Sequence, residues 1–277
     1  MADPRDLKFT LTDFRRVRKM VYQRVGIALN DSKTHMAYSR LARRVRQHGL
    51  KRFADYLDML EGAEASPEWQ HFINALTTNL TAFFREPHHF DTLKQHAQER
   101  LRAGRPYNVW SSASSTGEEP YSIALTLLQV PGVSLANTHI VASDIDTQVL
   151  QHASAGVYDA ERVASLAPAL LHRFFLRGVG RNEGKVRLKR ELRQYLEFYQ
   201  FNLVQESWPQ MGPFDAIFCR NVLIYFDKPT QARILRQMAE CLMPDGLLFL
   251  GHSENIQHIC DAFQPCGRTV YRRVNHD

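Results

Sequence analysis

Cysteine is scarce in this sequence and shows no pairing pattern. The 277 residues include four cysteines, and their spacing contains no C-x-x-C pair and no spacing typical of zinc ligands. This argues against a disulfide-rich scaffold and against a zinc site. We therefore expect reduced thiols, most of them buried as small apolar side chains: Cys219, Cys241, Cys260 and Cys266.

Long apolar runs are also missing. No stretch approaches the ~18 apolar residues that a membrane-spanning helix needs, so we expect no membrane insertion. The N-terminal segment MADPRDLKFTLTDFRR carries charges where a secretory signal has an apolar core. We therefore expect a cytoplasmic protein.

The composition is that of a globular protein that can bury a core, with 44% apolar and 23% charged residues. The net charge of +6 is unevenly distributed, because residues 33–52 carry seven Lys or Arg and no acid. Such local charge indicates an acidic partner for the N-terminal part.

The first 80 residues show helical periodicity. Residues 12–29 place apolar side chains at 3.6-residue spacing behind Thr12 as a cap, and another helix is predicted to begin near Ser66-Pro67-Glu68. Between them, residues 38–49 predict a helix whose arginines lie away from its apolar arc: Arg40, Arg43, Arg44 and Arg46. We predict a helical domain over residues 1–80, followed by a linker and helix over 81–105.

From residue 106 onward, strand-like and helix-like segments alternate. This alternation predicts a mostly parallel, doubly wound α/β sheet over residues 106–277. Two strands around Pro244-Asp245-Gly246 are expected to form an antiparallel edge. Between residues 155 and 200, glycines among short β-prone runs break the alternation, and we predict an inserted β-hairpin region, about 160–195.

Two segments that follow predicted strands indicate a nucleoside site. SSASSTGEEP (111–120) is rich in small residues and opens a helix, but Glu118 and Glu119 would repel a pyrophosphate, so a cationic ligand is favoured over a dinucleotide. Asp144 follows the next strand, where a carboxylate can accept hydrogen bonds from ribose hydroxyls. Asp146 is expected to cap the next helix. Together these features point to S-adenosylmethionine, with an ordinary strand-to-helix loop as the alternative for 111–120.

Two further segments deliver polar residues to the same region. FDAIFCRNVLIYFD (214–227) is a buried strand running into Arg220, Asn221 and Tyr225, although Tyr225 could instead be a core residue and Arg220 a surface ion pair. In NLTAFFREPHHF (79–90), His88 and His89 resemble a metal pair. Because adjacent helical residues point about 100° apart and no third ligand is evident, we expect solvated histidines and no metal.

These blocks, in this order and spacing, resemble the CheR-type chemotaxis protein methyltransferases, which methylate glutamates of bacterial chemoreceptors. The matching segments are NALTTNLTAFFREPHHF, VWSSASSTGEEPYSIA, ASDIDTQVL, GPFDAIFCRNVLIYFDK, LRGVGRNEGKVRL and PDGLLFLGHSE. The resemblance implies a small all-α N-terminal domain before a Rossmann-like class I S-adenosylmethionine domain with an inserted antiparallel β-subdomain.

The resemblance also implies roles for individual residues. Arg85 and Tyr225 are expected beside the transferred methyl group, and Glu119 near the methionyl end. The β-subdomain, with Arg177, Gly178 and Gly180, is expected to dock a C-terminal receptor pentapeptide. The arginines of residues 40–46 are expected to face the acidic receptor helices, with a solvated basic face as the alternative. The residues expected around the cofactor are Asn79, Thr81, Arg85, Ala113, Glu119, Asp144, Ile145, Asn202, Leu203, Arg220 and Asn221.

The expected reaction gives a glutamate γ-methyl ester and S-adenosylhomocysteine. A glutamate carboxylate has a pKa near 4.3, so it is ionised at neutral pH and needs no general base. Two other functions stay open. The basic helix would also suit a nucleic acid methyltransferase, although Asn-Val-Leu-Ile-Tyr replaces the [ND]-P-P-[YF] motif of base methylation. The other is a non-catalytic signalling module that binds the cofactor.

Overall fold

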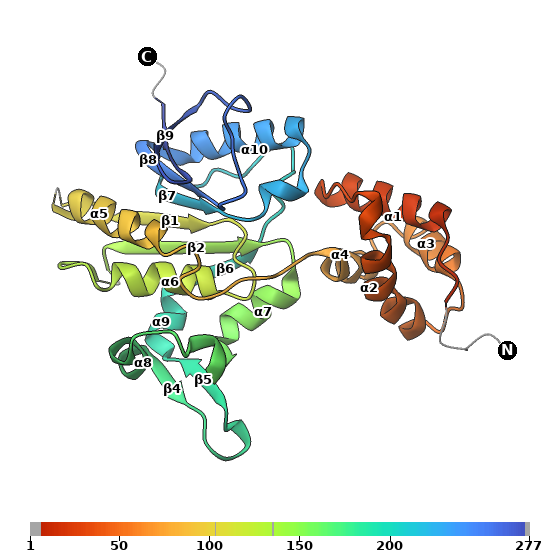
Figure 1. Ribbon diagram of the computed structural model, residues 1–277, viewed down its shortest axis with the longest axis horizontal. Coiled ribbons are helices and arrows are strands. Elements are labelled where there is room, and N and C mark those ends of the chain that lie inside the picture. Colours follow the sequence, from red (N-terminus) through yellow and green to blue (C-terminus); the bar gives the residue numbers. More distant parts are fainter. Residues whose placement is uncertain (1–6, 103, 135, 275–277) are drawn as a thin grey trace.

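The N-terminal part of the chain is helical (Figure 1). The computed structural model describes residues 7–102, 104–134 and 136–274, so the outermost residues of the predicted domains lie outside it. Before residue 107 the described residues form no strand beyond a single bridge between Lys8 and Arg52. The elements of this part are α1 (Leu11–Val25), η1 (Asp31–Lys33), α2 (Thr34–Gln47), α3 (Phe53–Glu61), α4 (Glu68–Leu76) and α5 (His88–Arg102).

Helix α1 begins one residue earlier and ends four residues earlier than its periodicity predicts. Thr10, not Thr12, is the N-cap. The Thr10 hydroxyl accepts a hydrogen bond from the Asp13 N–H at 3.1 Å, and the Asp13 carboxylate accepts one from the Thr10 N–H at 2.8 Å. This reciprocal capping box satisfies two N–H groups, whereas a cap at Thr12 would leave them unpaired.

The end of α1 meets the C-terminal domain. Gly26 ends the helix in the left-handed conformation, with φ at 70°. A Cβ at this position would lie 2.6 Å from Cγ1 of Val204. Ala28, expected on the helix, lies beyond it, and its N–H donates to the carbonyl of Tyr225 at 2.8 Å. The turn after α1 therefore joins the two domains.

Replacing Gly26 with alanine is expected to destabilise the protein by about 2–4 kcal/mol, because left-handed strain adds to overpacking against Val204. Gly49→Ala is the matched control, since Gly49 also follows a helix with φ at 68° but has no described atom within 4 Å of a new Cβ. Urea denaturation measures both variants. Equal losses would show that the domain contact adds nothing.

The C-terminal domain is built on a mixed sheet. Among the described residues it has seven strands in the order β6-β2-β1-β7-β8-β10-β9. The first five are parallel, and β10 is antiparallel to both of its neighbours. Renumbered along the chain this order is 3-2-1-4-5-7-6, a doubly wound α/β arrangement that confirms the predicted fold class. The strands are β1 (Tyr107–Ser111), β2 (Thr138–Asp144), β6 (Leu196–Gln200), β7 (Phe214–Cys219), β8 (Leu242–Leu250), β9 (Phe263–Gly267) and β10 (Val270–Arg273).

The Pro244-Asp245-Gly246 segment is not the predicted turn. It lies inside β8, where the pairing with β7 shifts register between Phe214 and Ala216. Proline and glycine are tolerated at such irregularities, and the local composition does not distinguish a bulge from a turn. The predicted antiparallel edge does exist, but β10 and β9 form it together with β8.

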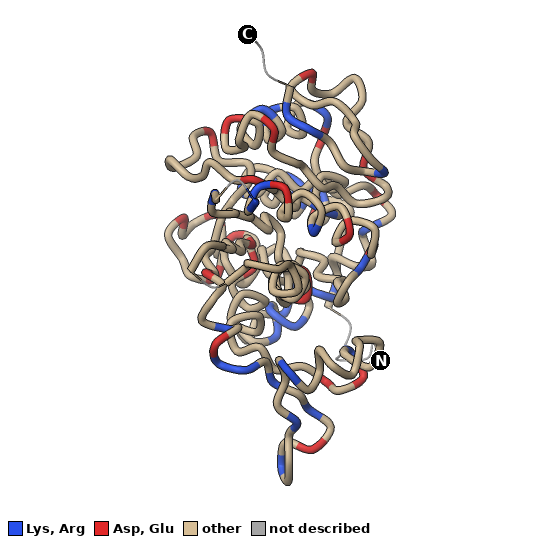
Figure 2. The backbone as a smooth tube through the Cα atoms, turned by 90° about the vertical axis from the view of Figure 1, so that its left-hand side faces the viewer, with Lys and Arg blue, Asp and Glu red and all other residues tan. Residues whose placement is uncertain are grey.

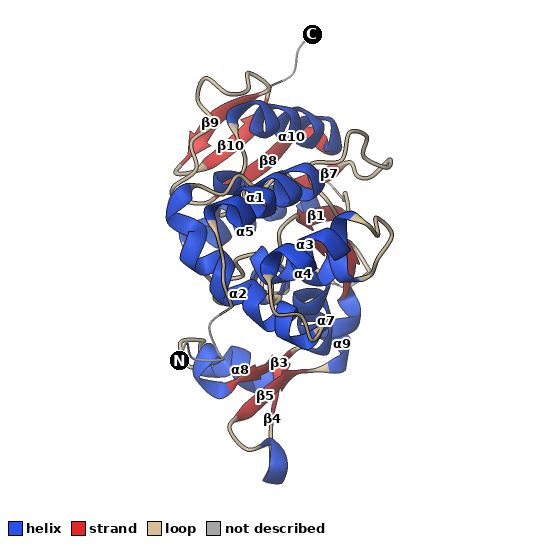
Figure 3. Cartoon of the chain, turned by 90° about the vertical axis from the view of Figure 1, so that its right-hand side faces the viewer, coloured by secondary structure: helices blue, strands red, loops and turns tan. Residues whose placement is uncertain are grey.

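Helices cover both faces of the sheet. One buried cluster joins α5 and α6 (Glu118–Leu127) to the sheet around Val109 and Phe218. A second cluster, on the other face, packs α10 (Lys228–Cys241) around Trp110 and Ile217. α7 (Thr147–Ala155) follows β2 and contacts α4. Figure 3 shows the helical domain in front of this sheet.

A second, small sheet interrupts the alternation, as predicted. Its antiparallel strands have the order β3-β5-β4, and it projects from the main domain. The segment 196–200, predicted within the irregular region, is instead β6 of the main sheet. Figure 2 shows blue Lys and Arg along this projection. We call residues 157–189 the β-subdomain: β3 (Val157–Asp159), η2 (Ala160–Val163), α8 (Pro168–Phe174), β4 (Phe175–Arg177), η3 (Gly180–Asn182) and β5 (Lys185–Leu188); α9 (Arg190–Tyr195) then leads to β6.

The cysteines are unpaired and mostly buried, as expected from the sequence. All four thiols are free, with Cys219, Cys241 and Cys260 buried and Cys266 exposed. Among the described residues, no helix has the length and apolarity that crossing a bilayer requires.

Candidate functional site

A cavity of about 490 Å³ opens between the two domains. One side is formed by residues at or after the carboxyl ends of β1, β2, β6 and β7, and the other side comes from the helical domain, including Val25 and residues 27–30. Ligands of open α/β sheets bind at this edge, and the volume suits a cofactor-sized molecule.

The predicted site residues meet in this cavity. Every residue expected around the cofactor lines it, and so does Tyr225. They come from segments up to 146 residues apart, Asn79 to Tyr225, so the chain fold assembles the site. Their contacts with a bound molecule stay predictions.

Asp144 ends β2 and is 8% exposed. One carboxylate oxygen accepts from the Ser115 N–H at 2.8 Å and the other from the Asp146 N–H at 3.0 Å. Burial raises the pKa of Asp144 to about 6, although these two N–H groups partly oppose the rise. Each oxygen keeps a lone pair, so the pair of oxygens can accept from a vicinal diol.

Asp146 has the structural role that its sequence predicts. Its carboxylate caps α7 by accepting from the N–H groups of Gln148 and Val149. Asn79 and Thr77 also donate to it, at 2.9 and 2.8 Å. The side-chain amide of Asn79 thus ties the linker to α7, while the residue lines the cavity.

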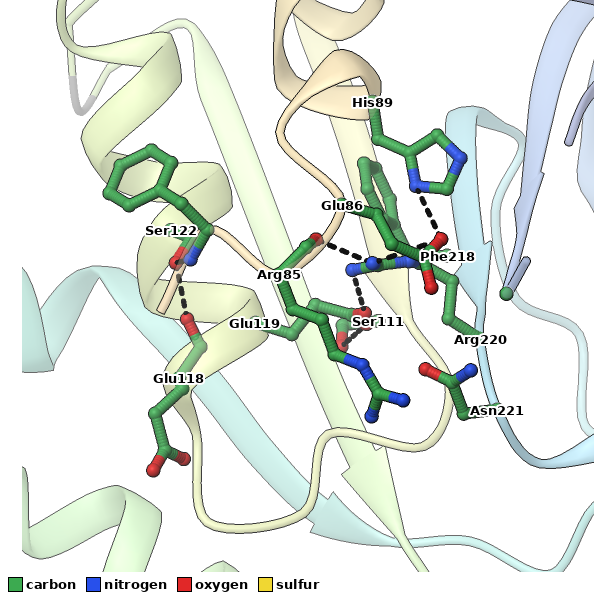
Figure 4. Close-up of polar contacts among 12 residues, drawn as sticks. Arg85, Glu86, His89, Ser111, Glu118, Glu119, Ser122, Phe218, Arg220 and Asn221 are labelled. Atoms are coloured by element: carbon green, nitrogen blue, oxygen red, sulfur yellow. Dashed lines mark hydrogen bonds and ion pairs between the residues drawn. The ribbon is translucent and has the colours of Figure 1, made fainter. Parts of the chain in front are cut away.

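Glu119 is held by a buried ion pair rather than presented alone (Figure 4). Arg220 Nη1 donates to Glu119 Oε2 at 2.9 Å, and the Ser111 hydroxyl donates to Oε1 at 2.8 Å. Arg220 also contacts Glu86 at 3.4 Å and donates to the carbonyl of Arg85. Burial raises the pKa of Glu119, and Arg220 and Ser111 oppose this. Arg220 therefore belongs to a buried ion pair, and the alternative of a surface ion pair is wrong.

The neighbouring Glu118 points elsewhere. Its side chain is fully buried and pairs with Arg162 of the β-subdomain. The two acids of the turn therefore differ: Glu119 faces the cavity, and Glu118 anchors the inserted sheet.

A strained turn presents Arg85. Phe84 and Glu86 on either side of it have positive φ angles of 51° and 59°. The Phe84 N–H donates to the Ser122 hydroxyl at 2.9 Å, and Arg85 Nη1 donates to the carbonyl of Leu80 at 2.9 Å. The turn thus places a guanidinium at the cavity wall beside the Glu119–Arg220 pair (Figure 4).

The expectation of solvated histidines is wrong for His89, which is fully buried. Its Nε2 lies 2.9 Å from the Thr269 hydroxyl, and burial together with Arg220 lowers its pKa to about 3. Glu86 is the third potential ligand that the sequence did not reveal, since its carboxylate lies within 4.8 Å of both histidines. Arg220 already neutralises this carboxylate, and His88 and His89 begin a helix, whose N-terminus disfavours cations, so we assign no metal here.

The α2 arginines do not form one exposed face. Arg44 pairs with Glu68 of α4, which is 6% exposed, and Arg40 donates to the Thr77 carbonyl and lines the cavity. Helical periodicity shows which side chains leave the apolar arc but not which acids lie opposite them. Arg43 and Arg46 are exposed.

Sequence reasoning missed the cavity wall from the helical domain. Val25 and residues 27–30, with Lys33, Met36 and Arg40, line the cavity. The signal was an apolar run, Val25-Gly26-Ile27-Ala28-Leu29, whose glycine ends the helix. Interpreted as the end of the helix over residues 12–29, this run gave no reason to expect that it lines a cavity.

The donor set fits a ligand with a ribose and a zwitterionic end. Asp144 can accept from a diol, Glu119 can accept from an ammonium group, and the backbone N–H groups and polar side chains of the lining remain for a carboxylate. Small residues after β1, including Ala113, leave room beside them.

Comparison with known proteins identifies the family. The model of the CheR methyltransferase SAM binding domain matches residues 79–272, and that of the CheR methyltransferase all-alpha domain matches residues 12–77. The chemotaxis protein methyltransferases of Salmonella typhimurium and Escherichia coli are each 54% identical over 93% of this chain, covering 88% and 89% of their own lengths. Chemotaxis protein methyltransferase 2 of Pseudomonas aeruginosa is 51% identical over 96% of this chain and 94% of its own. The chain therefore belongs to the CheR family of S-adenosylmethionine-dependent methyltransferases.

Proposed function

We propose that this protein methylates glutamate side chains in the cytoplasmic domains of bacterial chemoreceptors, giving γ-methyl esters for adaptation in chemotaxis. The names of the relatives support the process. The observation that carries the substrate class is the lining of the cavity, which includes Arg85 and Tyr225 as well as the Glu119–Arg220 pair. A carboxylate substrate suits the Arg85 guanidinium and the Tyr225 hydroxyl. The reaction would take place in the cytoplasm, where these receptor domains lie.

For this reaction the protein needs to position the substrate carboxylate and the methyl donor, but it does not need to activate the nucleophile. When bound, S-adenosylmethionine supplies a methyl group on a sulfonium sulfur. The glutamate nucleophile is already ionised at neutral pH. Holding it in line is worth about 7–11 kcal/mol from orientation alone. Arg220 uses both of its terminal nitrogens inside the chain, so we assign the aiming of the substrate carboxylate to Arg85. Tyr225 can donate a hydrogen bond to the same group.

The test is transfer of labelled methyl groups to receptor-containing membranes. We expect label on the receptors that mild alkali releases as methanol, as carboxyl methyl esters require. Label on DNA or RNA instead would favour the nucleic acid methyltransferase. Cofactor binding without a labelled product would favour the non-catalytic module.

The exposed arginines of α2 are proposed to guide receptor docking. Arg43 and Arg46 follow the cavity-lining Arg40 on the same helix, α2, and the methylated receptor helices carry glutamates. Each exposed ion pair is worth about 0–1 kcal/mol and is screened by salt, so these side chains steer docking more than they anchor it.

We further propose that the β-subdomain docks a receptor's C-terminal pentapeptide. Residues 157–189 carry seven Lys or Arg against three acids, which favours a peptide ending in a carboxylate. β4 is an edge strand of the small sheet; Leu176 within it is 52% exposed, and Val179, two residues after it, is 79% exposed. An extended peptide can add to such an edge.

Gly178→Ala is expected to abolish tail-dependent turnover while leaving methylation of tailless receptors intact. A Cβ on Gly178 would lie 2.0 Å from the carbonyl oxygen of Asn182, so the hairpin beside β4 must open. Gly184→Ala is the control for backbone strain without a clash, because Gly184 is in the same hairpin with φ at 78° but has no described atom within 4 Å of a new Cβ. Initial rates with receptors that have or lack the tail measure the effect, and an unchanged tail-dependent rate would exclude this docking site.

Affinity for S-adenosylhomocysteine is expected to fall below a pH of about 6, where Asp144 becomes protonated. Only the carboxylate accepts from both ribose hydroxyls, so the limiting loss is about tenfold per pH unit. Calorimetric titration across this pH range measures it. Asp144→Asn, which cannot ionise, should bind weakly with a flat profile. A flat wild-type profile would contradict the assignment.

A further inference from the structure

Loop 220–226 follows β7 and carries three of the site residues. Its backbone lies outside the sheet, so strand pairing does not satisfy its hydrogen-bonding groups. It contains Arg220, Asn221 and Tyr225, and a 3-10 turn η4 (Leu223–Tyr225). Asn221 has φ at 59°, a conformation uncommon outside glycine. Something outside the loop must satisfy its backbone and hold this shape.

Glu254 satisfies the N–H groups of this loop. One of its oxygens accepts from the Val222 and Leu223 N–H groups at 2.9 and 2.8 Å. The other accepts from Asn221 N–H at 2.8 Å and from Gly251 N–H at 2.6 Å. The Glu254 residue is only 5% exposed. Successive N–H groups of this kind form an anion-binding concavity, and here the chain's own carboxylate fills it.

The approach of the two loops is close. A Cβ on Gly251 would lie 2.2 Å from Nδ2 of Asn221, so only glycine allows this contact. At the other end of the loop, Gln231 of α10 donates to the carbonyls of Leu223 and Phe226, each at 2.9 Å. The loop that carries Tyr225 is therefore held by two side chains, Glu254 and Gln231.

We propose that Glu254 is a positioning residue for methyl transfer, which acts by fixing loop 220–226 and thereby Asn221 and Tyr225. Its four acceptor sites are filled by backbone N–H groups, so it has no capacity left to contact cofactor or substrate. Gln231 supports the same loop through the carbonyls of Leu223 and Phe226. This inference depends on methyl transfer in the cavity, as proposed above.

The test compares two buried acids: Glu254, which contacts the loop after β7, and Asp215, near the start of β7. Glu254→Gln puts an NH₂ group against backbone N–H donors and should shift the loop. We expect kcat on receptor membranes to fall about 30- to 100-fold, because misplacement by about 1 Å costs that much. The Kd for S-adenosylhomocysteine should rise no more than about fivefold, a split that a general loss of folding would not produce.

Asp215→Asn is the matched control. Asp215 is 4% exposed, accepts from the Asn108 N–H at 2.8 Å, and lies at the start of β7, away from the cavity. It should lose stability with kcat unchanged. Gln231→Leu provides a second test should Glu254→Gln fold poorly, and a lower kcat is expected there too.

A folded Glu254→Gln with wild-type kcat, or an equal fall in kcat for Asp215→Asn, would overturn the proposal. Wild-type turnover on the same membranes, measured in parallel, tests the proposed function separately. Loss of methylation in every sample including wild type would point to the function, not to Glu254.

Discussion

Replacing Arg220 with methionine is expected to destabilise the folded protein by about 3–5 kcal/mol, the usual result of removing one partner from a buried ion pair. The Arg220 side chain is 2% exposed, and those of Glu119 and Glu86 are 10% and 11% exposed. Without the guanidinium, two nearby carboxylates face each other in a buried site. Urea denaturation, followed by the fluorescence of the buried Trp110, measures the loss.

The pH dependence separates charge from packing. Burial already raises the pKa of Glu119, and loss of Arg220 raises it further. When a carboxyl group has a higher pKa in the folded state, the folded protein loses stability as the pH rises above the group's unfolded pKa of about 4.3. The defect of Arg220→Met should therefore shrink in acid, and adding Glu119→Gln should restore part of the stability at neutral pH. A defect that is constant with pH and unaffected by the second substitution would mean that lost packing dominates.

Replacing Arg85 with alanine is expected to lower kcat on receptor membranes by about 100-fold or more. The positive φ angles of Phe84 and Glu86 present this guanidinium at the cavity wall, and its fork can hold the attacking carboxylate in line. Rates at saturating cofactor, measured with labelled methyl groups, isolate this loss from cofactor affinity.

Three variants sharpen the Arg85 test. Arg85→Lys keeps the charge but loses the fork, and should recover only part of the rate. Tyr225→Phe removes one hydrogen bond and should cost less than Arg85→Ala. Arg102→Ala changes an exposed arginine in the last turn of α5 and should leave the rate unchanged. If neither Arg85→Ala nor Tyr225→Phe altered turnover, both roles would be withdrawn.

Fold class and cavity composition were predictable because they depend on repeated, local patterns. The alternation of strands and helices after residue 106 predicts a doubly wound sheet, whose carboxyl edge gathers the residues that follow its strands. Asp146 could be assigned as a cap from its place before α7. Asp144, at the end of the preceding strand, could be placed in the cavity by the same reasoning.

Errors arose where one local pattern is compatible with two structures. Pro244-Asp245-Gly246 reads as a turn, but it is an irregularity within β8. The apolar run after Val25 reads as a helix, but Gly26 ends α1 so that the run can line the cavity.

The amino-acid sequence by itself determined most of the helices and strands, the polar residues that follow the strands, and the family. These features depend on periodicity, turn chemistry and motif spacing, which are properties of neighbouring residues. Only the tertiary structure decided which charges meet. Glu119 with Arg220, Arg44 with Glu68 and Glu254 with loop 220–226 are contacts between segments 24 to 101 residues apart. Such pairings depend on how helices and loops pack in space, and local periodicity contains no information about them.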